Sequence, residues 1–145
     1  LHTDVADNPG AVTRFVLVSR PGAVPAPTGA DKATIQVALP VNESGALLTL
    51  LEQFAVRGVN LCRIESRPTK TFLGSYCFSM DAEGHLADRR LAEALLGLRR
   101  ICRDVVFLGS YARADKQPPD VREGFADADF LEAATWLRSL GGESA

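Results

Sequence analysis

The sequence has 145 residues, of which 46% are hydrophobic and 23% are charged, with a formal net charge of −2. This length suits one ordinary domain, or a small domain of about 70 to 80 residues with extensions. No apolar run approaches the roughly 20 residues of a membrane-spanning helix, and the start lacks a basic segment followed by an apolar core. We therefore expect a soluble, cytoplasmic protein that does not bind membranes.

The cysteines and histidines favour neither a metal site nor a cofactor. Cys62, Cys77 and Cys102 are far apart in apolar sequence and form no CxxC pair, so we interpret them as buried reduced thiols. His2 and His85 have no second metal-type ligand at a recognisable spacing. We expect no metal, no cofactor and no catalysis that depends on histidine.

The first 33 residues predict a strand and a linker. Residues 11–19, "AVTRFVLVS", are rich in β-branched and aromatic residues and follow the turn signal Asn-Pro-Gly, which predicts a strand. Residues 20–33 contain three prolines and two glycines, which oppose both helix and sheet and predict an extended linker. The chain begins with Leu1, and no element precedes the strand to pair with it, so we expect a piece of a longer protein.

Alternating elements follow the linker. Apolar residues recur with period two in the strand segments and with helical spacing in the helix segments, and Gly58 supplies a helix stop. Pro68 ends the second strand, and "DAEGH" at residues 81–85 is expected to turn the chain. The predicted strands are 33–40, 60–67, 71–80 and 104–112, and the predicted helices are 45–57 and 86–98.

This order predicts an α+β fold of the ferredoxin-like βαββαβ type, a four-stranded antiparallel sheet with two helices on one face. The other face of the sheet is left uncovered, which favours pairing with another copy or another domain. Residues 113–125 form a second polar linker. A last helix carries Phe130, Ala134 and Leu137 on one face, with Asp129 and Glu132 placed like a capping box, and we expect it to dock on the domain or a partner subunit.

Two motifs together suggest a family. "GALL" at residues 45–48 opens the first helix, and "ESRP" at residues 65–68 ends the second strand. In this fold order they resemble the GAL and ESRP motifs of the ACT regulatory domain of prephenate dehydratase, and the similarity covers roughly residues 34–111. "TRF" at residues 13–15 is similar to the end of the catalytic domain of that family, although Ala11 stands where the family often has asparagine.

The resemblance implies a division of the chain and a function. Residues 1–19 would be the end of the catalytic domain, 20–33 a linker, 34–112 the ACT domain, and 113–145 a polar linker with the C-terminal helix. The parent enzyme would convert prephenate to phenylpyruvate, water and carbon dioxide in phenylalanine biosynthesis. L-phenylalanine would bind the ACT domain as feedback effector. The ACT domain would form a homodimer, with a tetramer as a further option in the parent, and would act on the catalytic domain of the same chain.

The helix start is a physically suitable place for a carboxylate. The N-terminus of a helix presents unpaired amides and the positive end of the helix dipole, and Gly45 lets a ligand approach the backbone. Asn42 and Ser44 would either cap the helix or bind the ligand. By resemblance, the backbone at Glu65 and Ser66 faces the glycine turn of a neighbouring subunit. The candidate ligand-binding residues are Asn42, Ser44, Gly45, Ala46, Leu47, Leu48, Glu65, Ser66, Arg67 and Pro68.

The other candidate residues have roles at the strand end, in an apolar wall or in catalysis. Arg67 and Pro68 are expected to fix the end of the strand, and Leu47, Leu61 and Phe72 are candidates for the apolar wall, unless they simply pack in the core. The resemblance makes Thr13 a catalytic hydrogen-bond or proton donor within the motif Thr13, Arg14 and Phe15. Arg14 is suited to a substrate carboxylate. A threonine hydroxyl needs a water-excluded cleft for that role, so the chain alone is expected to be inactive.

Two alternatives belong to other classes. The same fold order occurs in RNA-binding RRM domains, and Phe72, Tyr76 and Phe78 alternate onto one strand face. The mildly acidic charge opposes nucleic-acid binding, which depends on basic patches. The second alternative is a dimerisation module that binds no ligand.

Overall fold

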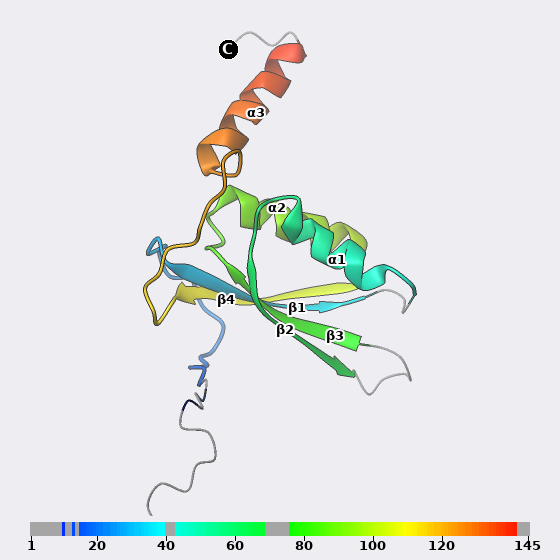
Figure 1. Ribbon diagram of the computed structural model, residues 1–145, viewed down its shortest axis with the longest axis vertical. Coiled ribbons are helices and arrows are strands. Elements are labelled where there is room, and N and C mark those ends of the chain that lie inside the picture. The colour runs from blue at the N-terminus through cyan, green and yellow to red at the C-terminus, as the bar shows by residue number, and fades with distance from the viewer. Residues whose placement is uncertain (1–9, 11–12, 14, 40–42, 69–75, 142–145) are drawn as a thin grey trace, which may run out of the picture.

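The computed structural model describes residues 10, 13, 15–39, 43–68 and 76–141. Its core is an antiparallel four-stranded sheet with α1 and α2 on the same face, which confirms the predicted ferredoxin-like order (Figure 1). The elements are β1 (Asp31–Ala38), α1 (Ala46–Ala55), β2 (Leu61–Pro68), β3 (Tyr76–Glu83), α2 (Arg89–Ile101), β4 (Asp104–Ala112) and α3 (Asp127–Leu140).

β1 lies inside the sheet, which has the strand order β2-β3-β1-β4. It pairs along its length with β3 on one side and with β4 on the other. Its side chains alternate between buried and half-buried, and Ile35 and Val37 are fully buried under the helices. This alternation is the pattern expected of a strand that has one covered face.

The core lies between the sheet and the two helices. α1 contributes Leu50 and Phe54, and α2 contributes Leu91 and Leu98, all with 1% or less of their surface exposed. α1 ends where the Val59 amide donates to the Phe54 carbonyl at 3.0 Å, a bond typical of helix ends closed by a left-handed glycine. The buried residues therefore recur at the helical spacing of the sequence, whereas Leu47, at the same spacing, is 40% exposed.

Several predicted boundaries are wrong. β3 continues through Glu83, because Asp81 to Glu83 pair with β1, so the predicted turn begins about three residues too early. α2 begins at Arg89 and not at Leu86. The reason is a turn before the helix, in which the Asp88 carboxylate accepts a hydrogen bond from the His85 amide at 2.8 Å.

The strand predicted at residues 11–19 is also wrong for the residues that the structure describes. Residues 13 and 15–19 adopt no strand, and the side chains of Phe15 to Val18 are between 66% and 101% exposed. A strand needs a neighbour to satisfy its backbone groups, and the described part of the sheet offers this segment none. Residues 11, 12 and 14 lie outside the described residues.

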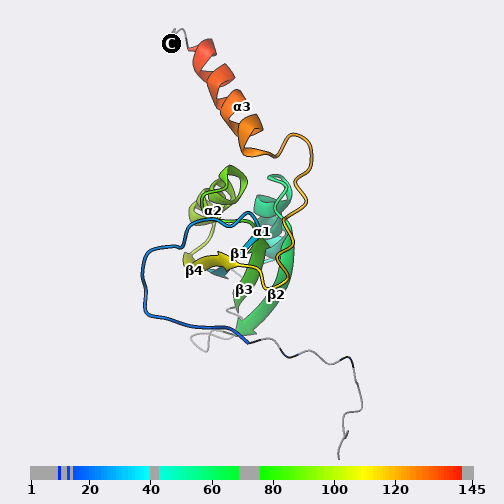
Figure 2. The same ribbon diagram turned by 90° about the vertical axis from the view of Figure 1, so that its left-hand side faces the viewer.

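The C-terminal helix differs from its prediction in two respects. α3 begins at Asp127, and the Asp129 carboxylate accepts a hydrogen bond from the Ala126 amide at 2.8 Å. Asp129 is therefore the helical residue of the cap, and it is not the residue that begins a capping box with Glu132. The helix also does not dock its apolar face on the domain (Figures 1 and 2). Trp136, Leu137 and Leu140 are each more than 60% exposed. Docking on a partner subunit stays a prediction.

Within the part of the chain that the structure describes, no helix combines the length and the apolar character that a membrane crossing requires.

Leu98→Ala and Leu96→Ala form a matched test of the core. Leu98 is fully buried and Leu96 is 61% exposed on the same helix. We expect Leu98→Ala to reduce the free energy of unfolding by about 2 to 5 kcal/mol, because it leaves a cavity in the core. Leu96→Ala should change it by less than about 0.5 kcal/mol. Urea unfolding followed by circular dichroism measures both, and equal losses would contradict the assigned core.

Candidate functional site

The strand register brings the two candidate motifs to the same end of the sheet. Arg67 of β2 pairs with Cys77 of β3, and Cys77 pairs with Ala38, the last residue of β1. From there the chain continues into α1, which begins at Ala46. Figure 1 shows the start of α1 and the end of β2 on the same side of the domain. The topology therefore supports the spatial grouping that the motifs suggested.

Gly45 sets the geometry of the helix start. Its φ of 88° lies in the left-handed region, and a Cβ at this position would meet no atom within 4 Å. Glycine is therefore required by backbone conformation, and the space beside it is open. Among the described residues, no side chain caps the helix at Gly45, and the first turn of α1 contains no acidic residue. The N-terminus of α1 therefore presents backbone amides and the positive end of the helix dipole to the open space beside Gly45.

The other candidate residues around Gly45 differ in how exposed they are. Ser44 is exposed, as is Leu48, while Ala46 is half-buried and Leu47 is 40% exposed. Asn42 lies outside the described residues. The exposed leucines are apolar surface beside an amide-rich helix end, which suits a ligand that has a carboxylate and an apolar group.

A β-bulge decides which way the side chains of β2 point. Leu61 pairs with Ala82 and Arg63 pairs with Asp81, so Cys62 is an additional residue that has no partner in the register. Beyond the bulge, Ser66 pairs with Phe78 and lies on the helix side of the sheet, while Glu65 pairs with Ser79 on the open side. Sequence reasoning missed this bulge, because nothing in an apolar and polar alternation shows an inserted residue.

A buried ion pair on the open face anchors β2. Arg63 donates from Nε to Asp81 Oδ2 and from Nη2 to Asp81 Oδ1, both at 3.0 Å, and from Nη2 to Ser79 at 2.9 Å. Thr34 also donates to Asp81 Oδ1 at 2.8 Å, and the Asp81 side chain is only 1% exposed. A bidentate guanidinium and a hydroxyl satisfy a carboxylate that would otherwise be costly to bury. Sequence reasoning assigned no role to these residues.

The Glu65 carboxylate belongs to the same charged group. It forms ion pairs at 3.2 Å with Arg63 and with Arg67. A hydrogen bond from Arg67 and the charge of Arg63 hold the pKa of Glu65 below its ordinary value. The Glu65 and Arg67 side chains therefore bind each other on the open face. Arg67 therefore ties the Glu65 side chain at the end of the strand, and the proposed ligand contacts of Glu65 and Ser66 stay a prediction.

The GALL and ESRP motifs of one chain do not bind each other through polar contacts of the described residues. Among the described residues, no hydrogen bond or ion pair connects Ser44 to Leu48 with Glu65 to Pro68. Leu61, a candidate wall residue, packs partly against the core, and Phe72 lies outside the described residues. A second subunit as the missing side of the pocket stays a prediction.

The structure does not support the RRM alternative. Phe78 is 8% exposed and belongs to the hydrophobic core, so the strand face that it shares with Tyr76 is turned toward the helices. An RNA-binding sheet needs its aromatic rings on the open face, where bases can stack. Phe78 is therefore a core residue, and Tyr76, which is 42% exposed, lies on the helix side of the sheet and not on its open face.

The catalytic motif forms no site in the described structure. Thr13 is exposed, Phe15 is 87% exposed, and Arg14 lies outside the described residues. Within the described residues, no group of His, Cys, Asp and Glu side chains is placed to hold a metal ion.

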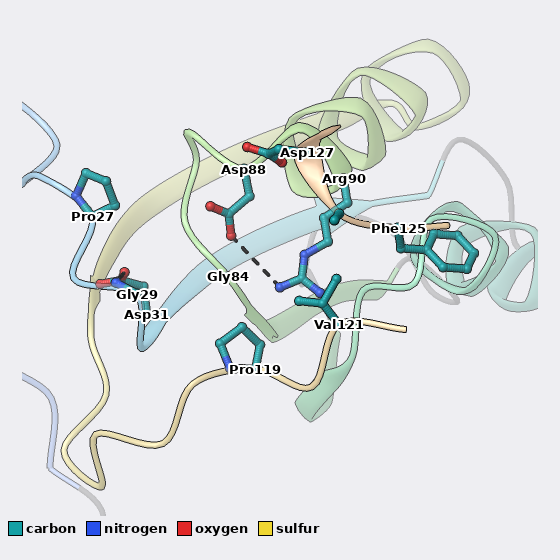
Figure 3. A pocket seen from close by; sticks show the side chains of 11 residues that line it. Pro27, Gly29, Asp31, Gly84, Asp88, Arg90, Pro119, Val121, Phe125 and Asp127 are labelled. Atoms are coloured by element: carbon teal, nitrogen blue, oxygen red, sulfur yellow. Dashed lines mark hydrogen bonds and ion pairs between the residues drawn. The ribbon is translucent and has the colours of Figure 1, made fainter. Parts of the chain in front are cut away.

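A cavity of about 260 Å³ lies at the opposite end of the sheet (Figure 3). Its walls come from residues 27–31, 84–90 and 119–127, and none of the residues proposed from the sequence lines it. The cavity is therefore separate from the site formed by the helix start and the end of β2.

Comparison with known proteins supports the motif assignment. No family model matches the chain. A prephenate dehydratase from Amycolatopsis methanolica is 48% identical over 97% of this chain and 46% of its own length. A prephenate dehydratase from Arthrobacter aurescens, solved in complex with L-Phe, is 58% identical with a TM-score of 0.91, over 97% of this chain and 46% of that chain. The resemblance to prephenate dehydratase is confirmed.

The matches cover only part of each similar protein. The chain spans less than half the length of the prephenate dehydratases that it matches, which fits a regulatory fragment of such an enzyme. A further similar structure, the quorum quenching acylase GqqA, is 32% identical with a TM-score of 0.61, over 68% of this chain and 36% of that chain. These matches therefore do not assign the activity of a whole protein to this chain.

Asp81→Asn and Glu65→Gln test the charged group on the open face. Asp81 is buried and bonded by Arg63 and Thr34, so we expect its replacement to reduce the free energy of unfolding by about 2 to 4 kcal/mol. Glu65 is exposed to solvent, and its ion pairs are screened, so Glu65→Gln should leave the denaturation midpoint nearly unchanged. Urea unfolding measures both variants, and an equal effect would show that the ion pair does not anchor β2.

Proposed function

We propose that this chain is the L-phenylalanine-binding regulatory part of a prephenate dehydratase. The parent enzyme would convert prephenate to phenylpyruvate, water and carbon dioxide, and the bound amino acid would control it by feedback. The chain alone would be inactive, because Thr13 and Phe15 lie exposed and do not line the cavity described above.

The observation that carries this proposal is the open helix start at Gly45, on the same end of the sheet as the end of β2. The α-carboxylate of the ligand would bind backbone amides in the first turn of α1, and the aromatic ring would contact apolar side chains such as Leu47 and Leu48. The similar structure from Arthrobacter aurescens was solved in complex with L-Phe, which supports the choice of ligand.

The pocket would be completed by a second copy of the chain. The backbone at Glu65 and Ser66 of one copy would face the Gly45 turn of the other, which agrees with the lack of a direct bond between the two motifs in one chain. Binding and dimerisation would then be linked, since a ligand held by two subunits stabilises their association.

Calorimetric titration with L-phenylalanine tests the proposal. We expect saturable binding and a higher melting temperature, because a ligand that binds only the folded state stabilises it by about 2.7 kcal/mol at 100 times its dissociation constant. Sedimentation should show a dimer at micromolar concentration that L-phenylalanine strengthens. A dimer that gives no heat and no thermal shift at millimolar ligand would instead identify a dimerisation module.

Gly45→Ala and Ser66→Ala locate the ligand. Gly45→Ala forces an alanine into the left-handed region at about 1 to 2 kcal/mol and should weaken binding while the domain stays folded. Ser66→Ala keeps the backbone amide and should weaken binding by about threefold to tenfold if the Ser66 hydroxyl contacts the ligand. Ser139→Ala on the exposed face of α3 is the matched control. Unchanged affinity in both test variants would place the ligand elsewhere.

A further inference from the structure

The cavity at the opposite end of the sheet contains a buried guanidinium. Arg90 belongs to the first turn of α2 and is only 3% exposed. Among the described residues, its polar contacts are a hydrogen bond of 3.4 Å from Nη1 to the Gly58 carbonyl and an ion pair of 4.0 Å from Nη2 to Asp88. Both distances exceed those of strong charge-assisted bonds. Arg90 therefore has donors that its protein partners satisfy only weakly.

The guanidinium of Arg90 is directed into the cavity. Figure 3 shows it between Asp88 and Val121, away from the axis of α2. A guanidinium presents five donors in a fixed fork that matches a carboxylate. A buried fork with long contacts, aimed at an open volume, is suited to bind the carboxylate of a small molecule.

Three carboxylates face the same cavity. Asp31 is 3% exposed and accepts from the Thr28 and Gly29 amides at 2.7 and 3.1 Å, and Asp127 accepts from the Arg89 amide at 2.8 Å. Asp88 is the third. With one guanidinium against three carboxylates, the lining has a net negative charge. This charge favours the ammonium group of a ligand, while Arg90 supplies a cationic group for a carboxylate.

We infer that this cavity binds a small zwitterion, an α-amino acid with a short apolar side chain, through the buried guanidinium of Arg90 and the carboxylates that face it. The carboxylate of the ligand binds Arg90, and its ammonium group binds Asp88 or Asp127. The apolar side chain contacts Pro119, Val121 and Phe125. This site is distinct from the one at Gly45, and the inference does not depend on the function proposed above.

The size of the cavity favours a small ligand. Its volume of about 260 Å³ lies below the range of roughly 300 to 1,000 Å³ that holds drug-sized molecules. A nucleotide or a large aromatic ligand would be difficult to enclose, whereas an amino acid of a few heavy atoms fits. The apolar residues from the segment 119–125 provide contact for a short side chain.

Contacts within the chain hold the walls of the cavity. Nδ1 of His85 accepts from the Ala87 amide at 3.0 Å, so Nε2 carries the proton and donates to the Pro25 carbonyl at 2.9 Å, which fixes one wall. On the other wall, the Phe125 ring lies against Gly58, where a Cβ would approach Phe125 Cγ to 2.7 Å. Walls held by such contacts lower the entropic penalty of binding a small molecule.

Titration of the 15N-labelled 145-residue chain with three matched probes tests the inference. L-alanine carries both charges, propionate lacks the ammonium group, and ethylamine lacks the carboxylate. We expect L-alanine to shift the amide resonances of Gly84, Arg90 and Phe125 with a millimolar dissociation constant, and each single-charge probe to bind about tenfold more weakly or less. Equal binding of propionate would show a plain anion site and overturn the inference, as would the absence of shifts with L-alanine at tens of millimolar.

Two variants separate binding from folding. Arg90→Gln should weaken L-alanine binding by about tenfold or more, the size expected for loss of charge-assisted hydrogen bonds. Because Arg90 is buried, circular dichroism must show that this variant folds. Val121→Phe fills the cavity from a residue that is 40% exposed, and Val106→Phe on β4, 42% exposed, is its control. L-alanine binding that survives Val121→Phe would overturn the inference. Ser66→Ala should leave these shifts unchanged, which distinguishes this site from the phenylalanine site.

Discussion

The register of β1 is the constraint on which the rest of the structure depends. β1 pairs with β3 and β4 together, and a slip of one residue would turn Ile35 and Val37 from the core to the open face. With the register fixed, the two ends of β1 are fixed as well. Its last residue, Ala38, lies at the same end of the sheet as the end of β2, with β3 between them, and leads to α1, whereas its first residue, Asp31, lines the cavity. Each candidate site therefore occupies one end of the same strand.

The bulge at Cys62 gives the edge strand two different faces. Without it, Arg63 would follow the alternation set by Leu61 and point toward the helices, where a guanidinium would have to be buried in apolar surroundings. With the bulge, Arg63 reaches Asp81 on the open face, and Ser66 points to the side on which α1 lies. One inserted residue thus separates the ion pair that anchors β2 from the surface that would contact a ligand.

Local periodicity explains why much of the fold was predictable. Leu50, Phe54, Leu91 and Leu98 recur at helical spacing and are all buried, and the strand at residues 104–112 has the predicted bounds. The wrong or missing predictions concern residues whose structure depends on contacts with distant parts of the chain. Residues 13 and 15–19 have the composition of a strand but no partner strand among the described residues. The buried partners of Arg63 are 16 and 18 residues away, and Arg90 meets its cavity only through segments far apart in the sequence.

α1 physically connects the two ends of the domain. It begins at Gly45, beside the proposed phenylalanine site, and the turn that follows it contains Gly58, which contacts Phe125 in a wall of the cavity. A ten-residue helix spans about 15 Å, so it bridges the distance between the two ends. The Phe125 ring leaves no room for even a Cβ at Gly58, which explains why glycine stands at this turn. Asp127, the first residue of α3, is bonded to the start of α2, while the apolar face of α3 remains exposed.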